Sequence, residues 1–291
     1  MRYRKWFPAV VFLVGVLAPA ISSVHAQAIT SFDPPGSTST SPTSINPAGE
    51  ITGAYVTSGF TRHGFVRDGR GSITSFDVPG STGTFPASIN PAGEITGAYL
   101  DSTGQHGFVR DGRGSITSFD PPGSIATFPQ SINPAGEITG WYYDSTGTHG
   151  FVRDRRGAFT SFDVPPPIPI PHSTRTQPWS INPAGEITGF YSFLGGSNQG
   201  FVRDRRGTFT TFDVPGSFET FATSINPAGE ITGSYIGGGT SHGFVRDGRG
   251  TFTSFDPPGS IATRPTSINP AGEITGSYFD GGTSHDFVRG R

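Results

Sequence analysis

The apolar residues of this chain fall in short segments separated by turns rich in Gly, Pro, Asn and Asp, and no segment has helical periodicity. In the stretch from residue 44 to residue 78, four short strands are predicted: Ser44–Asn46, Glu50–Val56, His63–Asp68 and Ser72–Val78. Asn-Pro-Ala-Gly lies between the first two and Asp-Gly-Arg-Gly between the last two, and both sequences favour tight hairpin turns. The pattern therefore predicts an all-β protein built from antiparallel hairpins.

These hairpins belong to a tandem repeat. Six copies of Ser-Ile-Asn-Pro-Ala-Gly-Glu-Ile-Thr-Gly begin at residues 44, 88, 131, 180, 224 and 267, at spacings of 44, 43, 49, 44 and 43 residues. A constant period of this size is typical of a unit that buries its apolar face only by stacking on its copies. Four antiparallel strands per period favour a propeller blade, whereas a parallel β-helix has much shorter rungs. We predict a six-bladed β-propeller of four-stranded antiparallel blades.

The two ends of the repeat array predict how the ring closes. Ile29–Asp33 has the sequence of a fourth strand without its first three, and His285–Arg289 that of a third strand without its fourth. We expect the two strands to pair and complete one blade, because closure removes exposed strand edges that promote aggregation.

Counting back from the second turn predicts cross-strand pairs between a histidine of the third strand and an aspartate of the fourth. The pairs are His63 with Asp77, His106 with Asp120, His149 with Asp163, His242 with Asp256 and, across the closure, His285 with Asp33; Gln199 replaces the histidine opposite Asp213. Such pairs stabilise a sheet by roughly 0.2–1 kcal/mol each. Because blades splay around an axis, the histidines are too far apart to share a metal ion, whose ligands lie at about 2 Å. We predict structural pairs, no catalytic residue, no metal and no cofactor.

The N-terminus and the composition indicate export. In residues 1–26, basic Arg2 and Lys5 precede the apolar stretch Phe7–Ala20, and small Val24 and Ala26 fit a signal cleavage site. The rest, 27–291, is expected to be one propeller domain, and it contains no Cys and no Lys. Cleavage would remove three basic residues and change the net charge of the chain from −2 to −5. The remaining arginines recur beside aspartates, so the chain has no basic surface of the kind that binds nucleic acids. We expect a secreted or periplasmic monomer with no membrane span after cleavage.

Departures from the repeat concentrate in the third and fourth copies. The connection between Asp163 and Ser180 is six residues longer than its equivalents and rich in proline, which favours a stiff loop. Aromatic residues beside such a loop are suited to stacking on sugar rings or docking a protein. The alternative for Trp141 and Phe190 is that they fill a gap between blades. The candidate binding residues are Trp179, Trp141, Phe190, His172, Tyr143 and Phe193.

No sequence motif indicates catalysis. Residues 239–243 match the G-x-S-x-G pattern of serine hydrolases, but they lie between two predicted strands with no helix after them. An enzyme also needs unlike acid and base groups near the central channel, whereas the predicted innermost strand is Ser-Ile-Asn in every copy. We expect a non-enzymatic binding or scaffold propeller whose partner is a polysaccharide or a cell-surface protein. The alternative is an extracellular polysaccharide hydrolase or lyase on the same fold.

At the level of the single repeat, the chain resembles the extracellular HAF-repeat family of bacteria. The resemblance runs from His106-Gly107-Phe108-Val109 through Asp120 to the hairpin of residues 131–140, and it extends over essentially all of 27–291. The chain departs from the family in having Gly where Ala is usual and Val-Arg-Asp where an apolar-Trp pair is common. The resemblance implies secretion and a propeller-like fold, and it assigns no activity and no site residue.

Overall fold

The computed structural model describes residues 30–166, 174–193 and 195–291. It divides the chain into Met1–Phe32 and a compact unit, Asp33–Arg291, which is described below. The predicted signal peptide, 1–26, and Ile29 lie outside the described residues. The described part contains 23 strands and no helix, and therefore no helix that could cross a membrane. The prediction of an all-β protein is confirmed.

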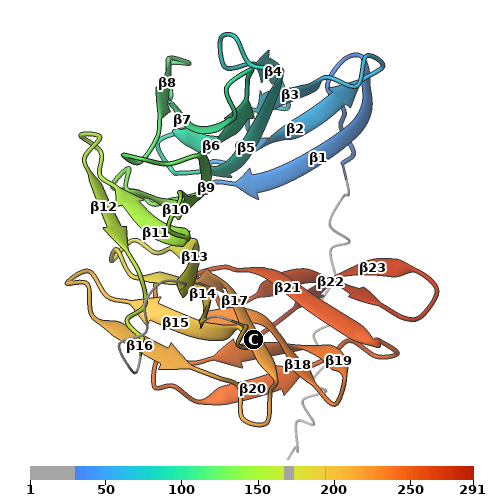
Figure 1. The fold of residues 1–291 in the computed structure, drawn as a ribbon. Helices are drawn as coiled ribbons and strands as arrows, with labels where there is room; N and C mark the ends of the chain where they lie inside the picture. Colours follow the sequence, from blue (N-terminus) through green and yellow to red (C-terminus); the bar gives the residue numbers. More distant parts are fainter. Residues whose placement is uncertain (1–29, 167–173, 194) are drawn as a thin grey trace, which may run out of the picture. The chain divides into compact units, whose positions relative to one another are not determined.

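Six antiparallel modules follow one another along the chain, one for each copy of the repeat (Figure 1). Modules one and two are β1 (Ser37–Ile45), β2 (Ile51–Thr57), β3 (Arg62–Arg67), β4 (Ile73–Phe76), β5 (Gly83–Ile89), β6 (Ile95–Leu100), β7 (Gln105–Arg110) and β8 (Ile116–Phe119). Modules three and four are β9 (Ala126–Ile132), β10 (Ile138–Tyr143), β11 (Thr148–Arg153), β12 (Phe159–Phe162), β13 (Thr174–Ile181), β14 (Ile187–Phe193), β15 (Gln199–Arg203) and β16 (Phe209–Phe212). Modules five and six are β17 (Glu219–Ile225), β18 (Ile231–Gly237), β19 (Thr240–Arg246), β20 (Phe252–Phe255), β21 (Ala262–Ile268), β22 (Ile274–Phe279) and β23 (Ser284–Arg289).

Hydrogen bonding groups these modules two by two. Within a module, consecutive strands pair antiparallel, as predicted. A single parallel bridge then joins β3 to β5, β11 to β13 and β19 to β21. The described strands therefore form two eight-stranded sheets and one seven-stranded sheet rather than six separate four-stranded ones.

The first strand of each module is longer than predicted and contains a β-bulge. β5 begins at Gly83, several residues before the predicted Ser-Ile-Asn segment. Its register shifts between Pro86 and Ser88, which leaves Ala87 without a partner on β6. The same shift follows in all six first strands. Opposite the bulge, a Cβ on Gly97 would lie 2.2 Å from the carbonyl oxygen of Phe85, which explains the glycine that ends every copy of the motif.

The Ser-Ile-Asn segment holds each module to the next. The Asn90 side chain accepts hydrogen bonds from the backbone N–H groups of Ala92 and Glu94, both at 3.0 Å. Its Nδ2 donates to Glu94 Oε2 at 2.7 Å and to the carbonyl of Asn133 in the next module at 3.1 Å. Asn46, Asn133, Asn182 and Asn226 make the equivalent links. A side chain that satisfies four partners at a module boundary explains why all six copies keep this motif.

The hydrophobic core lies between neighbouring modules. Ile95 and Phe108 of module two are fully buried, and Val66 and Phe76 of module one pack against their cluster. The guanidinium of Arg110 covers the same Phe76 ring at 5.0 Å from its centroid. Equivalent clusters recur along the chain. Each module therefore depends on its neighbour for burial, as expected for stacked repeats.

The predicted closure through the two chain ends is not seen among the described residues. Thr30–Asp33 forms no strand, and β23 pairs with β22 alone among the described strands. In the five complete modules, the third-strand residue that faces the fourth-strand phenylalanine is Gly, where a Cβ would lie 2.3–2.8 Å from the ring. Module six has Asp286 at this position. A phenylalanine on a fourth strand beside Asp286 would have to shift from the position it takes in the other modules.

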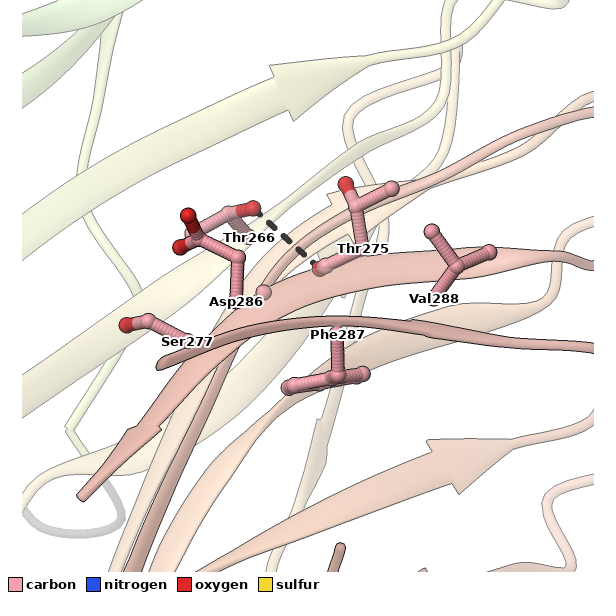
Figure 2. Close-up of a pocket in the computed structure, with 7 residues that line it drawn as sticks. Thr266, Thr275, Ser277, Asp286, Phe287 and Val288 are labelled. Carbon is pink, nitrogen blue, oxygen red and sulfur yellow. Dashed lines mark hydrogen bonds between the residues drawn. The ribbon is translucent and has the colours of Figure 1, made fainter. Parts of the chain in front are cut away.

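The outer faces of modules one and six are exposed. Ile45 is 65% exposed, whereas its equivalent Ile89 is 5% exposed. On module six, Val288 is 72% exposed and borders a hollow of about 450 Å³. Figure 2 shows the side chains that line this hollow, including Asp286 and the hydrogen bond from Thr266 to the carbonyl of Thr275. The hollow is the face that, in other modules, the next module covers.

Candidate functional site: a central cavity

Residues from all six modules line one cavity of about 420 Å³. Each module contributes its bulge residue, the one that precedes Ser-Ile-Asn: Thr43, Ala87, Gln130, Trp179, Thr223 and Thr266. The other lining residues are Phe85, Pro86, Ala98, Gln105, Phe128 and Pro129. A β-bulge redirects the side chain of the extra residue, and bulges are enriched beside functional sites. Here the six bulges converge on one cavity.

The cavity wall differs from one side to the other. Modules two, three and four supply the aromatic rings of Phe85, Phe128 and Trp179, and modules one, five and six supply threonines. No charged side chain is among the described residues that line the cavity. An apolar, ring-lined side facing a hydroxyl-lined side suits an uncharged ligand with one flat apolar face and one polar edge.

The threonine side offers hydrogen-bond acceptors. Thr43 Oγ1 donates its proton to the carbonyl of Pro86 at 3.0 Å, and Thr223 Oγ1 donates to the carbonyl of Pro265 at the same distance. Because a hydroxyl has one donor and two lone pairs, the oxygens keep acceptor capacity once the protons are used. This side of the cavity can therefore accept hydrogen bonds from ligand hydroxyl groups.

Trp179 is the largest side chain of the cavity wall. It lies on β13, is 37% exposed, and stacks on Phe190 with 6.1 Å between ring centroids and 23° between planes. Phe190 is only 8% exposed and meets Phe221 of the next module edge-on at 5.1 Å. Two further rings thus support Trp179 while part of its surface stays accessible to a ligand.

The five predicted binding residues that the structure describes do not form one exposed patch. Phe190 is buried, so the alternative that it fills a gap fits its position. Trp141 is half-buried and stacks on Phe128 of the cavity wall with 3.7 Å between centroids. Tyr143 is 39% exposed at the end of β10, and Phe193 packs edge-on against Tyr191. His172 lies outside the described residues. Of the predicted set, Trp179 lines the cavity directly, and Trp141 and Phe190 support the lining rings.

Sequence reasoning missed most of the cavity wall. The identity of Ser-Ile-Asn in every copy indicated a uniform channel, yet the cavity is lined by the residues just before that segment. Phe85, Phe128 and Gln130 belong to this variable stretch. A signal was present in the sequence, because the residue before the motif is Thr, Ala, Gln, Trp, Thr and Thr in the six copies.

Four of the five predicted histidine–aspartate pairs are formed. The Nδ1···Oδ2 distances are 2.8 Å for His63–Asp77 and His149–Asp163, and 2.7 Å for His106–Asp120 and His242–Asp256. Gln199 Nε2 donates to Asp213 Oδ2 at 2.6 Å. The fifth pair is wrong: His285 Nε2 lies 3.1 Å from Asp280, and Asp33 accepts from Thr40 Oγ1 at 2.6 Å. Asp33 is thus held within module one and not by His285.

The His106–Asp120 pair predicts a pH dependence of stability that His106→Gln will remove. Burial disfavours protonation of His106, but the hydrogen bond and charge of Asp120 and the charge of Asp101 outweigh it and raise its pKa. Because the pKa of His106 is higher in the folded state than in the unfolded state, protonated His106 stabilises the folded state. This contribution is complete below the ordinary pKa of 6.5 and is lost as the pH rises through the folded-state pKa. Urea unfolding of wild type and His106→Gln, which copies the Gln199–Asp213 pair, should therefore differ more at pH 6 than at pH 8. An equal difference at both pH values would contradict this prediction.

Comparisons with known proteins support the fold. No protein-family model matches the chain, and no curated protein matches it in sequence. Among solved structures, it is similar to a catalytically inactive virginiamycin B lyase from Staphylococcus aureus with quinupristin, at a TM-score of 0.57 and 15% identity, covering 85% of this chain and 84% of that one. The propeller domain of the Trilobed protease from Pyrococcus furiosus, described as having an open velcro topology, gives 0.60 at 10% identity, covering 87% and 82%. At such identities the likeness concerns the fold alone. The chain is a β-propeller protein.

Proposed function

We propose that this chain is a secreted or periplasmic β-propeller that binds an uncharged ligand in its central cavity and catalyses no reaction. The observation that carries the proposal is the cavity itself, with aromatic rings on one side, threonine oxygens on the other and no charged group among its described lining residues. Export rests on the sequence of residues 1–26 and on the resemblance to the HAF-repeat family.

We also infer that the six modules are the six blades of a single monomeric propeller. Each module contributes one bulge residue to the same cavity, as blades around a common axis do. In this arrangement module six is a three-stranded blade. Asp286 takes the place of the glycine over which a fourth-strand phenylalanine would lie, and this substitution supports a ring without strand closure.

A neutral saccharide is the ligand that this cavity fits best. The face of a pyranose ring is apolar and stacks on an aromatic side chain such as Trp179, and its hydroxyl groups can donate to threonine oxygens. A cavity of about 420 Å³ has the size of a small-molecule site, so it admits a short oligosaccharide or the end of a polysaccharide. A cell-surface protein would have to bind elsewhere on the molecule.

The alternative, a polysaccharide hydrolase or lyase, has less support. Glycoside hydrolysis generally requires two carboxylic groups on either side of the scissile bond. No carboxylate is among the described residues that line the cavity. The histidines that pair with aspartates lie on the third strands, each held by its own module. In the described residues, no group of three or more His, Asp or Glu could hold a metal ion.

Intrinsic fluorescence tests this proposal, since Trp141 and Trp179 are the two tryptophans of residues 27–291. We would titrate Trp141→Phe protein, whose emission then reports Trp179 alone, with neutral, acidic and amino oligosaccharides. We expect a saturable spectral change with neutral ligands and no release of reducing ends. A change of equal affinity with acidic sugars, or cleavage of any of the oligosaccharides, would contradict the proposed function.

A further inference from the structure

The exposed large apolar side chains gather at one end of the modules. We call this the loop end, where first strands begin and second strands end; the Asn-Pro-Ala-Gly and Asp-x-Arg-Gly turns lie at the opposite end. Ten large apolar residues are exposed in the described part of the chain. Ile45 and Val288 belong to the outer faces of modules one and six, and Trp179 lines the cavity. The other seven lie at the loop end: Phe60, Leu100, Ile125, Tyr143, Phe218, Ile261 and Phe279.

Most of these residues recur at two equivalent positions. The residue before or at the start of a first strand donates its N–H to the carbonyl of the residue that ends the second strand: Ile125 to Tyr143 at 2.8 Å, and Ile261 to Phe279 at 2.7 Å. The N–H of Phe218 likewise donates to the carbonyl of Ile236, one residue before the end of β18, at 2.7 Å. We define the apolar rim as Leu100, Ile125, Tyr143, Phe218, Ile261 and Phe279, which are 36–71% exposed. These residues lie at the loop end of modules two, three, five and six.

The rim residues lie on two pairs of neighbouring modules, two with three and five with six, and within each pair the loop ends are joined by a hydrogen bond. Gln105 Nε2 donates to the carbonyl of Thr127 in the next module at 3.3 Å, and Ser241 Oγ donates to the carbonyl of Thr263 at 3.0 Å. Apolar side chains that recur on one side of several modules, with none exposed on the turns of the other side among the described residues, indicate an interaction surface.

Carboxylates accompany the rim. Asp101, Asp144 and Asp280 directly follow Leu100, Tyr143 and Phe279 in the chain. Backbone N–H groups of Thr283 and Gly282 donate to Asp280 and lower its pKa to about 2. Hydrogen bonds from Thr103 and Thr146 lower the pKa of Asp101 and of Asp144. All three are therefore ionised at neutral pH. Nearby His106, His149 and His285 contact them at 3.1–3.3 Å, and residues 27–291 contain no Lys.

We propose that the apolar rim is a docking surface for a protein partner that presents apolar side chains interspersed with Lys or Arg. The combination of exposed apolar side chains and fixed carboxylates is complementary to such a partner. A lipid surface fits poorly, because anionic membranes attract basic residues and repel carboxylates. A second copy docked rim to rim fits poorly too, because a two-fold contact would bring like charges together. This surface lies outside the cavity and adds a protein-binding role to the proposed ligand-binding one.

Fluorescence anisotropy with synthetic probes tests the proposal. The probes are fluorescein-labelled amphipathic peptides, one of Leu and Lys and a matched one of Leu and Glu, added to the chain 27–291. We expect saturable, salt-sensitive binding of the Leu/Lys peptide and none of the Leu/Glu peptide. The variant Ile125→Ser/Phe218→Ser/Ile261→Ser should bind at least about tenfold more weakly. The control Ile45→Ser/Val288→Ser removes exposed apolar side chains outside the rim and should bind as wild type.

A charge variant keeps the test decisive if the rim variant folds poorly. Asp101→Asn/Asp144→Asn/Asp280→Asn should weaken binding of the Leu/Lys peptide at least about tenfold and reduce its salt dependence. Equal affinity of the peptide for wild type, rim variant and charge variant would overturn the proposal. Two other results would also overturn it, if the wild-type protein does not bind the peptide. One is binding to phosphatidylserine vesicles that the rim variant abolishes, and the other is dimerisation in analytical ultracentrifugation that the rim variant abolishes. Ligand binding in the cavity, measured by Trp179 fluorescence, is independent of all three outcomes.

Discussion

Replacing Gly140 by alanine will lower the free energy of unfolding by about 3 kcal/mol. Gly140 faces the β-bulge of module three across β9 and β10. A Cβ there would lie 2.2 Å from the carbonyl oxygen of Phe128 and 2.8 Å from the Cα of Pro129. Both are backbone atoms of the paired strand, so relief requires separating β9 from β10. Urea unfolding followed by circular dichroism measures the loss.

Gly140→Ala should also change the cavity wall, because the bulge that it disturbs directs Gln130 into the wall beside Phe128.

The matched control for the stability measurement is Gly59→Ala, since nothing lies closer than 3.9 Å to its added Cβ. We expect that control to stay within about 0.5 kcal/mol of wild type. If Gly140→Ala were equally harmless, the bulge described for every first strand would not exist in solution.

Replacing Trp179 by threonine will weaken binding of a neutral oligosaccharide at least about 30-fold, which corresponds to about 2 kcal/mol. The substitution removes the largest ring of the cavity wall and the apolar face on which a sugar ring would stack. Threonine already occupies the equivalent bulge in modules one, five and six, as Thr43, Thr223 and Thr266. The fold should therefore tolerate the change, and isothermal titration calorimetry should record lost affinity with little loss of stability.

The control for this variant is Trp141→Phe, which keeps an aromatic ring stacked on Phe128. We expect its affinity to remain within about threefold of wild type, because Trp141 supports the wall instead of lining it. A Trp179→Thr protein that binds like wild type would show that the ligand does not use the aromatic side of the cavity.

Much of the fold was predictable because the same local turn and strand signals occur in all six copies of the repeat. The two turn sequences fix the hairpins, and the two-residue periodicity of strands then places His63 opposite Asp77 without further information. The first strand was predicted too short, because only the repeated Ser-Ile-Asn was assigned to it. Pro86 is accommodated within the longer strand, since the bulge begins directly after it.

The cavity and the chain ends could not be predicted by the same rules. Which side chain a bulge redirects depends on pairing with the next strand, so the position of Trp179 looked like part of an outer patch. The ring closure was predicted from the strands that the incomplete repeats at the two chain ends lack. The prediction did not take into account that Asp286 replaces the glycine found at this position in the other modules. That departure, which is visible in the sequence, changes the surface that a fourth strand with a phenylalanine would meet on β23.

The measurement that tests the central claim most directly is a crystal structure of the chain 27–291 grown with the neutral oligosaccharide that gives the strongest Trp179 fluorescence response. We expect a sugar ring stacked on Trp179 within the cavity, with hydroxyl groups directed toward Thr43, Thr223 or Thr266. Ordered sugar bound only on the outside of modules three and four, with the cavity holding solvent, would contradict it.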